Sequence, residues 1–430
     1  MMIYLVVMLE VYFIWEALQR IRFLAAPHLV MIYCLLAQLV FYNAEALGYK
    51  EVAGPESLLS YQTNPNLGLT IYFVIALIAY TATIGFRISS RLLRSQLMMT
   101  LEHNDKFVRY AIWTVVGYTV LHFLLMDFDS LWYHRDYSTT GLRFDDAVSS
   151  VFGRLRPLVA MAAIVLMQLS LFSGKHSRFY LLLTVSVWQF LISFTGASRH
   201  AVVLIFASAG ASLMFARRRH LLIGITHGVL GFLVLQAMIA GRGGTEFGLS
   251  AIPGLVGGMF DTDWRSATFA LFNLFQGITV TVDGIVLSHE YDWSYALLSI
   301  SPLPSSIDGF DAVLATSQFR LSVFVPMSSI AEAYLFGWAI FSVVVVVFFL
   351  SLRSTLSVAK AGYQIWALLS SIFLAAMFVM ANAYPLRNTF RQFLLILVIN
   401  MVIVALAGAR ASRRQAPARR EISPLAARRF

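Results

Sequence analysis

The arginines of this chain have the side chains and positions best suited to binding a charged substrate. Arg199 stands in Gly196-Ala-Ser-Arg-His200, directly after a long apolar stretch. Arginine grips phosphate or carboxylate oxygens through two parallel N–H groups and stays charged at any physiological pH. The candidates are five outer arginines, on the side of the membrane that is predicted below to be outside: Arg199, Arg265, Arg320, Arg387 and Arg391. They predict a site for an anionic group such as a lipid-linked pyrophosphate. The alternative is that each arginine pairs with a carboxylate or extends to the lipid headgroups.

Glu332 is the carboxylate whose position most indicates a function. It lies in Ser329-Ile-Ala-Glu332-Ala-Tyr334, at the start of an apolar segment. A carboxylate at the edge of a membrane is costly unless it is paired or functional. Two roles fit, a salt bridge to an arginine or a base that takes a proton from a sugar hydroxyl. We expect its neighbour Tyr334, and His200 beside Arg199, to help bind the substrate.

No metal or cofactor site is predicted. Asp127 and Asp129 form one Asp-x-Asp pair, and Asp261 and Asp263 form another. Such pairs can hold a divalent cation, but two acids at this spacing are common in polar loops. No histidine or cysteine lies at zinc-ligand spacing, and no nucleotide-binding motif is present. We therefore predict that the protein works without metal or cofactor.

The composition places these residues in a membrane protein. Of 430 residues, 59% are hydrophobic and 13% charged, with a mean hydropathy of +0.74. Soluble proteins have roughly 45–50% apolar and 25% charged residues. These values exclude a soluble enzyme and a disordered regulator, and the single cysteine, Cys34, excludes an intrachain disulfide. The chain is predicted to be an all-α, polytopic membrane protein.

About eleven apolar segments are long enough to cross a bilayer. They span residues 2–19, 27–47, 67–86, 107–126, 155–173, 178–196, 201–216, 221–240, 328–350, 363–381 and 392–409. Of the 32 Lys and Arg residues, 21 fall on one side of this arrangement and 11 on the other. The positive-inside rule then places the N-terminus outside and the C-terminus in the cytoplasm. The net charge of +10 therefore reports orientation, and no nucleic-acid partner is predicted.

One long connection separates the eighth and ninth apolar segments. It covers residues 241–327 and contains several glycines and prolines, which favours short elements packed on the membrane domain over a separate soluble domain. Within it, residues 264–288 are apolar enough to resemble a further span. Another crossing would put the basic C-terminus outside, so a re-entrant or interfacial helix is predicted there. The domains are then a membrane domain over 1–409 and a disordered basic tail over 410–430 that can contact anionic lipids.

Three local features resemble the oligosaccharide repeat-unit polymerases (Wzy-type, O-antigen polymerases) of bacterial envelopes. The first is Gly196-Ala-Ser-Arg199 with Gly210 eleven positions after the arginine, which fits that family's R-x10-G pattern. The second is Glu332-Ala-Tyr334-Leu-Phe336-Gly337 after the long connection. The third is the arginine-bearing loop around Arg387 and Arg391. The predicted topology, with a large late periplasmic loop, agrees with the same family.

The resemblance implies a fold like that of the GT-C glycosyltransferases, in the bacterial inner membrane. It implies a metal-independent transfer of glycan from undecaprenyl pyrophosphate to another lipid-linked oligosaccharide, with membrane lipids and a chain-length regulator protein as partners. Arg199 and Arg265 would stabilise the departing pyrophosphate and Glu332 would be the base. Arg320, Arg387, Arg391, His200 and Tyr334 would bind the substrate. Two alternatives remain, an O-antigen ligase with His289 as its histidine and a lipid or polysaccharide transporter.

Overall fold

The computed structural model contains helices and turns, and its described residues form no strand. It describes residues 2–48, 65–88, 105–133, 143, 146–196, 198, 200–214, 218–241, 247–260, 263–303, 308–321 and 327–420. The long helices are α1 (Met2–Arg20), α2 (Ala26–Tyr42), α5 (Pro65–Thr83), α7 (Asp105–Leu124), α9 (Asp146–Phe172), α10 (His176–Thr195), α11 (His200–Met214), α12 (Arg218–Gly241), α20 (Trp338–Lys360), α21 (Gln364–Ala381) and α22 (Leu386–Arg420). The all-α class is confirmed.

Seven of these helices are both long and apolar enough to cross a membrane, namely α5, α9, α10, α12, α20, α21 and α22. Helix α2, residues 108–124 of α7 and residues 200–212 of α11 are apolar but shorter. Lipid offers no partner to backbone N–H and C=O groups, so continuous helices are expected in such stretches. The molecule is therefore consistent with a polytopic membrane protein, and eleven crossings stays a prediction.

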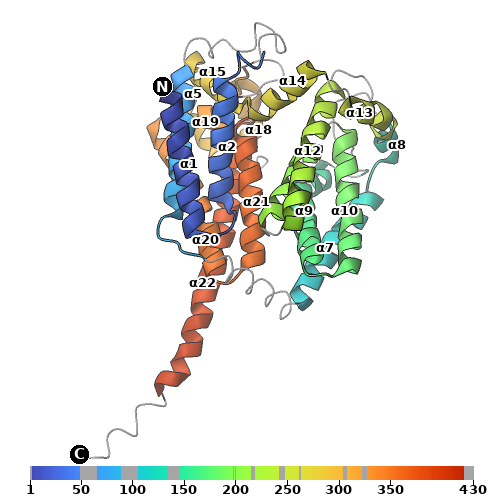
Figure 1. Cartoon of the computed structure of the whole chain (residues 1–430), viewed down its shortest axis with the longest axis vertical. Coiled ribbons are helices and arrows are strands. Elements are labelled where there is room, and N and C mark those ends of the chain that lie inside the picture. Colours follow the sequence, from blue (N-terminus) through green and yellow to red (C-terminus); the bar gives the residue numbers. More distant parts are fainter. Residues whose placement is uncertain are drawn as a thin grey trace, which may run out of the picture.

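The helices form two groups that lie side by side in Figure 1. One group contains α1, α2, α5, α20, α21 and α22, and the other contains α7, α9, α10, α11 and α12. Helix α21 joins them, because it packs on α2 in the first group and on α9 and α11 in the second. Helix α22 leaves the bundle at the end opposite the N-terminus and continues as helix to Arg420, so the part of the predicted disordered tail before residue 421 is helical.

Short elements cover the end of the bundle that holds the N-terminus. They are α8 (Phe128–Trp132), η1 (Leu249–Ala251), α13 (Ile252–Met259), α14 (Trp264–Phe275), α15 (Gly277–Leu287), α16 (Trp293–Ser299), α18 (Phe310–Ser317) and α19 (Ser329–Leu335). Most belong to the 241–327 connection, and they pack on the long helices α2, α5, α12 and α22. Figure 1 shows α13, α14, α15, α18 and α19 gathered at this end.

The apolar stretch 264–288 forms the helix pair α14 and α15, which meet at an angle of 59°. The bend falls at Gln276, next to Gly277. A Cβ atom on Gly277 would lie 2.2 Å from Cβ of Asn382, so glycine allows this bend to pack against the end of α21. A bend of this size fits a re-entrant segment or a broken span. The re-entrant or interfacial helix predicted here therefore stays a prediction.

The ninth predicted segment, 328–350, is divided by a break. Helix α19 ends at Leu335, and α20 begins at Trp338 after Gly337, whose φ of 91° is a left-handed value that glycine adopts readily. The apolar helix long enough to cross runs over Trp338–Lys360. Glu332 therefore lies outside that helix, in a separate short element, because the helix is interrupted at Gly337.

Candidate functional site

Glu332 is completely buried in the middle of the short-element layer. Its Oε2 accepts a 2.6 Å hydrogen bond from the backbone N–H of Leu386, the first residue of α22. Its Oε1 accepts a 3.3 Å bond from the hydroxyl of Tyr295 on α16. A carboxylate at a helix N-terminus satisfies a free N–H and is favoured by the helix dipole. Glu332 thus links α16, α19 and the start of α22.

Burial also changes the acidity of this carboxyl group. Loss of solvation raises the pKa of Glu332 to about 7, although the bonds from Leu386 and Tyr295 lower it in part. A carboxylate with a pKa near the working pH can both accept and release a proton. In the described arrangement, however, its two oxygens face protein donors. An acceptor hydroxyl could reach the carboxylate only by replacing Tyr295, which makes the longer of the two bonds.

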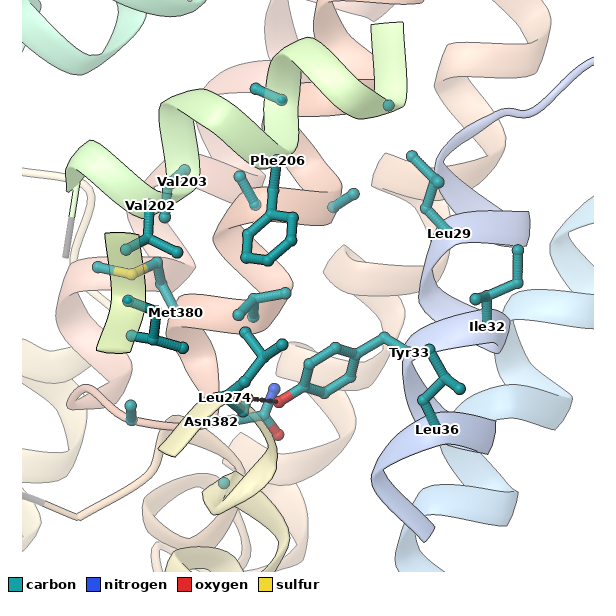
Figure 2. A pocket seen from close by; sticks show the side chains of 18 of the residues that line it. Leu29, Ile32, Tyr33, Leu36, Val202, Val203, Phe206, Leu274, Met380 and Asn382 are labelled. Carbon is teal, nitrogen blue, oxygen red and sulfur yellow. Dashed lines mark hydrogen bonds between the residues drawn. The ribbon is translucent and has the colours of Figure 1, made fainter. Parts of the chain in front are cut away.

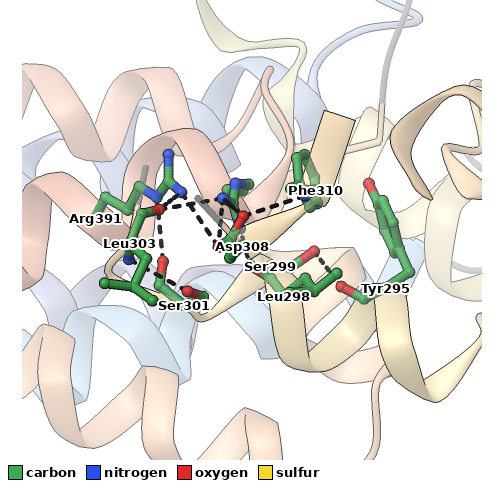
Figure 3. Close-up of polar contacts among 9 residues, drawn as sticks. Tyr295, Leu298, Ser299, Ser301, Leu303, Asp308, Phe310 and Arg391 are labelled. Atoms are coloured by element: carbon green, nitrogen blue, oxygen red, sulfur yellow. Dashed lines mark hydrogen bonds and ion pairs between the residues drawn. The ribbon is translucent and has the colours of Figure 1, made fainter. Parts of the chain in front are cut away.

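Arg387 and Arg391 do not pair with Glu332. Two hydrogen bonds of 2.8 Å join Nη2 of Arg387 to the carboxylate of Asp308, and its guanidinium lies 3.9 Å from the ring centre of Phe310. Arg387 also bonds the carbonyls of Leu298 and Leu303, and it is 2% exposed. Arg391 lies 3.8 Å from Asp308, and its Nε donates to the carbonyl of Ser301 (Figure 3).

This network ties Leu298, Ser301, Leu303 and Asp308 to the start of α22. Burial raises the pKa of Asp308, but the hydrogen bonds from Arg387, Ser301 and the backbone of Phe310 together with the charge of Arg387 outweigh that effect and hold the pKa below its usual value. Asp308 is therefore ionised, and its charge compensates that of Arg387. The carboxylate pairing considered for the outer arginines is thus observed for Arg387, with Asp308 as partner.

The other predicted site residues are dispersed. Arg265 and Arg320 are exposed, the first at the start of α14 and the second just after α18. Tyr334 is 47% exposed and packs edge-on against Trp338. Arg199 lies outside the described residues. His200 is the first residue of α11, and its Nδ1 lies 2.9 Å from the hydroxyl of Ser198. The described contacts bring Glu332, Arg387 and Arg391 into one layer and leave His200 in the second helix group.

An arginine that sequence reasoning did not single out lies near His200. Nη2 of Arg156, on α9, donates a 2.6 Å bond to the hydroxyl of Ser193 on α10. Arg156 is close enough to interact electrostatically with His122 on α7 and with His200 on α11. Its position in the sequence could have indicated it, because Arg156 stands directly before Pro157 at the start of an apolar segment.

A cavity of about 310 Å³ lies where the two helix groups face each other. Its walls come from α2, α11 and α21, and the bend between α14 and α15 closes one side. Figure 2 shows Tyr33 pointing from α2 to α14, where its hydroxyl bonds the carbonyl of Leu274 at 3.2 Å, and Phe206 pointing from α11 into the same space. Ligand pockets measure roughly 300–1,000 Å³ and are mostly apolar. The lining here is apolar except for a few groups that include Asn273, Gln276 and Asn382.

The face of α11 that lines the cavity leads to the polar cluster of Arg156. Val203, Phe206 and Gly210 line it at helical spacing, and His200 precedes Val203 by three positions. Residues three and four apart share one helix face. His200 therefore lies on the same helix face, one turn before the residues that line the cavity, and it interacts electrostatically with Arg156.

The Asp-x-Asp pairs have a local structural role. Asp127 accepts the backbone N–H of Asp129 at the start of α8, and Asp263 accepts that of Arg265 at the start of α14. Both are helix N-caps. Asp261 lies outside the described residues. Over the described ranges, no three His, Cys, Asp or Glu side chains gather in a way that could hold a metal ion.

Comparison of the chain with protein-family models, with curated proteins and with solved structures finds no match.

Proposed function

We propose that this protein is a membrane glycosyltransferase that polymerises lipid-linked oligosaccharide repeat units. The glycan on one polyprenyl pyrophosphate would be transferred to a hydroxyl of a second lipid-linked unit, and the pyrophosphate lipid would depart. The observation that carries the proposal is the apolar cavity between the helix groups, whose α11 wall continues by one turn to His200, which interacts electrostatically with the cation Arg156. Apolar walls suit a lipid chain, and a cationic end suits its anionic head.

The catalytic residues of the proposal are Arg199, Arg265 and Glu332. The arginines would stabilise charge on the departing pyrophosphate, and Glu332 would accept the proton of the acceptor hydroxyl. Its raised pKa supports this role, while its burial means that the acceptor must displace Tyr295. Arg320, Arg391, His200 and Tyr334 would bind the glycan, and Arg387 would hold Leu298, Leu303 and Asp308 in place. Two lipid chains held in one bundle would make the reaction effectively intramolecular.

We propose the bacterial inner membrane as the location, with the short-element layer on the periplasmic side. Ser250 and Ser177 test this orientation because both are exposed and lie near opposite ends of α10, Ser250 in the neighbouring element η1 and Ser177 in α10 itself. The N–H of Gly248 bonds the carbonyl of Thr195 at the last residue of α10, whereas Ser177 lies in its first turn. In a Cys34→Ala background, Ser250→Cys should react with an impermeant maleimide in intact spheroplasts. Ser177→Cys should react only after the membrane is permeabilised, and the reverse pattern would invert the topology.

The activity itself can be tested with purified protein and lipid-linked repeat units as the only substrates. We expect longer lipid-linked chains on a gel, with no ATP, no lipid A core and no added divalent metal, and with no effect of EDTA. Losing one contact to a developing oxyanion lowers a rate by about 10²–10³, so Arg199→Ala should extend chains that much more slowly.

Three results would contradict this assignment, and each indicates another class of protein. Transfer only when lipid A core is supplied would indicate a ligase. Extension only with Mg²⁺ or Mn²⁺ would make the reaction metal-dependent. Movement of the lipid across vesicles with no new glycosidic bond would indicate a transporter. Arg109→Gln, at an exposed position near the first turn of α7, is a suitable matched control for the arginine variants.

A further inference from the structure

Arg156 is a largely enclosed cation whose charge has no acidic partner in the described part of the chain. Its one described hydrogen bond is donated to Ser193, a neutral hydroxyl. The groups that interact with it electrostatically are Tyr118, His122 and His200. An enclosed charge is costly unless an opposite charge compensates it. Arg387 shows the contrast, because Asp308 neutralises it at 2.8 Å.

The guanidinium of Arg156 also has donors to spare. Arginine carries five N–H groups in a planar fork, and the single bond to Ser193 uses one of them. Arg156 is partly exposed, so its side chain is not sealed off from a ligand. A group with two adjacent oxygens could accept both N–H groups of one edge.

Unpaired polar atoms surround the same cluster. Nδ1 of His122 and Oε1 of Gln189 are buried and have no hydrogen-bond partner among the described residues. Gln189 belongs to the cluster because its backbone carbonyl accepts the hydroxyl of Ser193 and its amide nitrogen bonds Thr119 at 3.2 Å. Buried polar atoms of this kind are usually satisfied by a ligand or ordered water. Polar side chains of α7, α9 and α10 thus gather around one positive charge.

We propose that Arg156 binds the phosphate-type anionic head of a membrane lipid, with part of the lipid chain in the apolar cavity. This inference rests on the proposed function in identifying the head as the pyrophosphate of the lipid-linked substrate. His200 connects the two parts, since it interacts electrostatically with Arg156 and lies one turn before Val203 on the α11 face that lines the cavity. Phosphate oxygens match the guanidinium fork, and the apolar cavity on the same face of α11 suits an anion that carries a hydrocarbon chain.

Binding of polyprenyl pyrophosphate to the purified full-length protein tests the proposal. Binding would be measured in a neutral detergent by native mass spectrometry for wild type, Arg156→Gln, Arg156→Lys and the control Arg109→Gln. Hydrogen bonds to a charged group contribute enough that we expect Arg156→Gln to bind about 10- to 100-fold more weakly. Arg156→Lys keeps the charge without the fork and should be intermediate, and Arg109→Gln should match wild type.

Three further ligands identify what Arg156 recognises. Polyprenol has the chain but no phosphate, so its binding should be equal in wild type and Arg156→Gln. Inorganic pyrophosphate should compete with the lipid in wild type, and phosphatidylglycerol should compete weakly if the site prefers pyrophosphate. A loss of polyprenol binding equal to that of polyprenyl pyrophosphate would overturn the proposal, because Arg156 would then only maintain the structure. Unchanged pyrophosphate binding in Arg156→Gln would overturn it as well.

The binding and extension assays fail independently. Binding that depends on Arg156 in a protein that makes no longer chains would uphold this inference and reject polymerisation. Normal extension and normal binding by Arg156→Gln would reject this inference and leave polymerisation intact.

Discussion

Glu332→Gln protein is expected to bind lipid-linked repeat units normally and to lengthen them about 10²- to 10⁴-fold more slowly, the range that a general base contributes. Glutamine has the size of glutamate, and its carbonyl can still accept the 2.6 Å bond from the N–H of Leu386. The variant should therefore keep the start of α22 in place while losing the group that accepts a proton. Rates of chain extension and binding of the substrate, measured on the same preparation, separate these two effects.

The pH dependence provides a second measurement on the same residue. Because the pKa of Glu332 is raised to about 7, wild-type extension should increase as the pH rises through 7 and the carboxylate forms. Stability should change in the opposite direction. The unfolded chain loses this proton near pH 4.5 and the folded protein only near pH 7, so the free energy of unfolding falls by about 3 kcal/mol across that interval. Glu332→Gln should lack both effects.

Tyr295→Phe is the matched control for Glu332→Gln. It removes the hydroxyl that bonds Oε1 while leaving the carboxylate and the aromatic packing in place. If Glu332 is the base and the acceptor replaces Tyr295, this variant should retain extension. Normal extension by Glu332→Gln, together with the expected change in its pH-dependent stability, would assign Glu332 to capping α22 alone.

The second large effect is expected at the buried ion pair of Arg387 and Asp308. Removing one partner of a buried pair leaves an uncompensated charge, which costs about 3–5 kcal/mol. Arg387→Ala and Asp308→Ala should each lower the melting temperature of the purified protein strongly. Replacing both, as in Arg387→Met with Asp308→Leu, should recover much of the loss because neither charge then remains buried.

Arg265→Ala provides the stability control for this pair. Its side chain is exposed, and surface substitutions usually change stability by within about 0.5 kcal/mol. A melting temperature of Arg387→Ala equal to wild type, accompanied by lost extension, would contradict the structural role and return Arg387 to substrate binding. Melting followed by tryptophan fluorescence in one detergent measures all four variants under the same conditions.

Much of the secondary structure follows from the sequence. Apolar stretches of the length of a bilayer must form helices, because no other local structure satisfies the backbone in lipid. The bend at Gln276 is less predictable, because the apolar pattern of 264–288 continues through it. The neighbouring Gly277 is required by the close approach of Asn382, a contact between distant parts of the chain that the local pattern does not show. In the same way, the apolar pattern of 328–350 does not reveal the break at Gly337 that separates Glu332 from the crossing helix.

The sequence by itself determined the helical class, the membrane setting and the concentration of arginines around one long connection. Only the tertiary structure decided which charges meet: Arg387 pairs with Asp308, Glu332 caps α22, and Arg156 has no acid beside it in the described part of the chain. The physical reason is the range of the forces involved. Hydropathy and helix formation depend on neighbours within a few turns, which the sequence displays directly. The partners of buried charged groups lie far away in the sequence, 54 positions from Glu332 to the N–H of Leu386 and 79 from Asp308 to Arg387, and helix packing decides which of them meet.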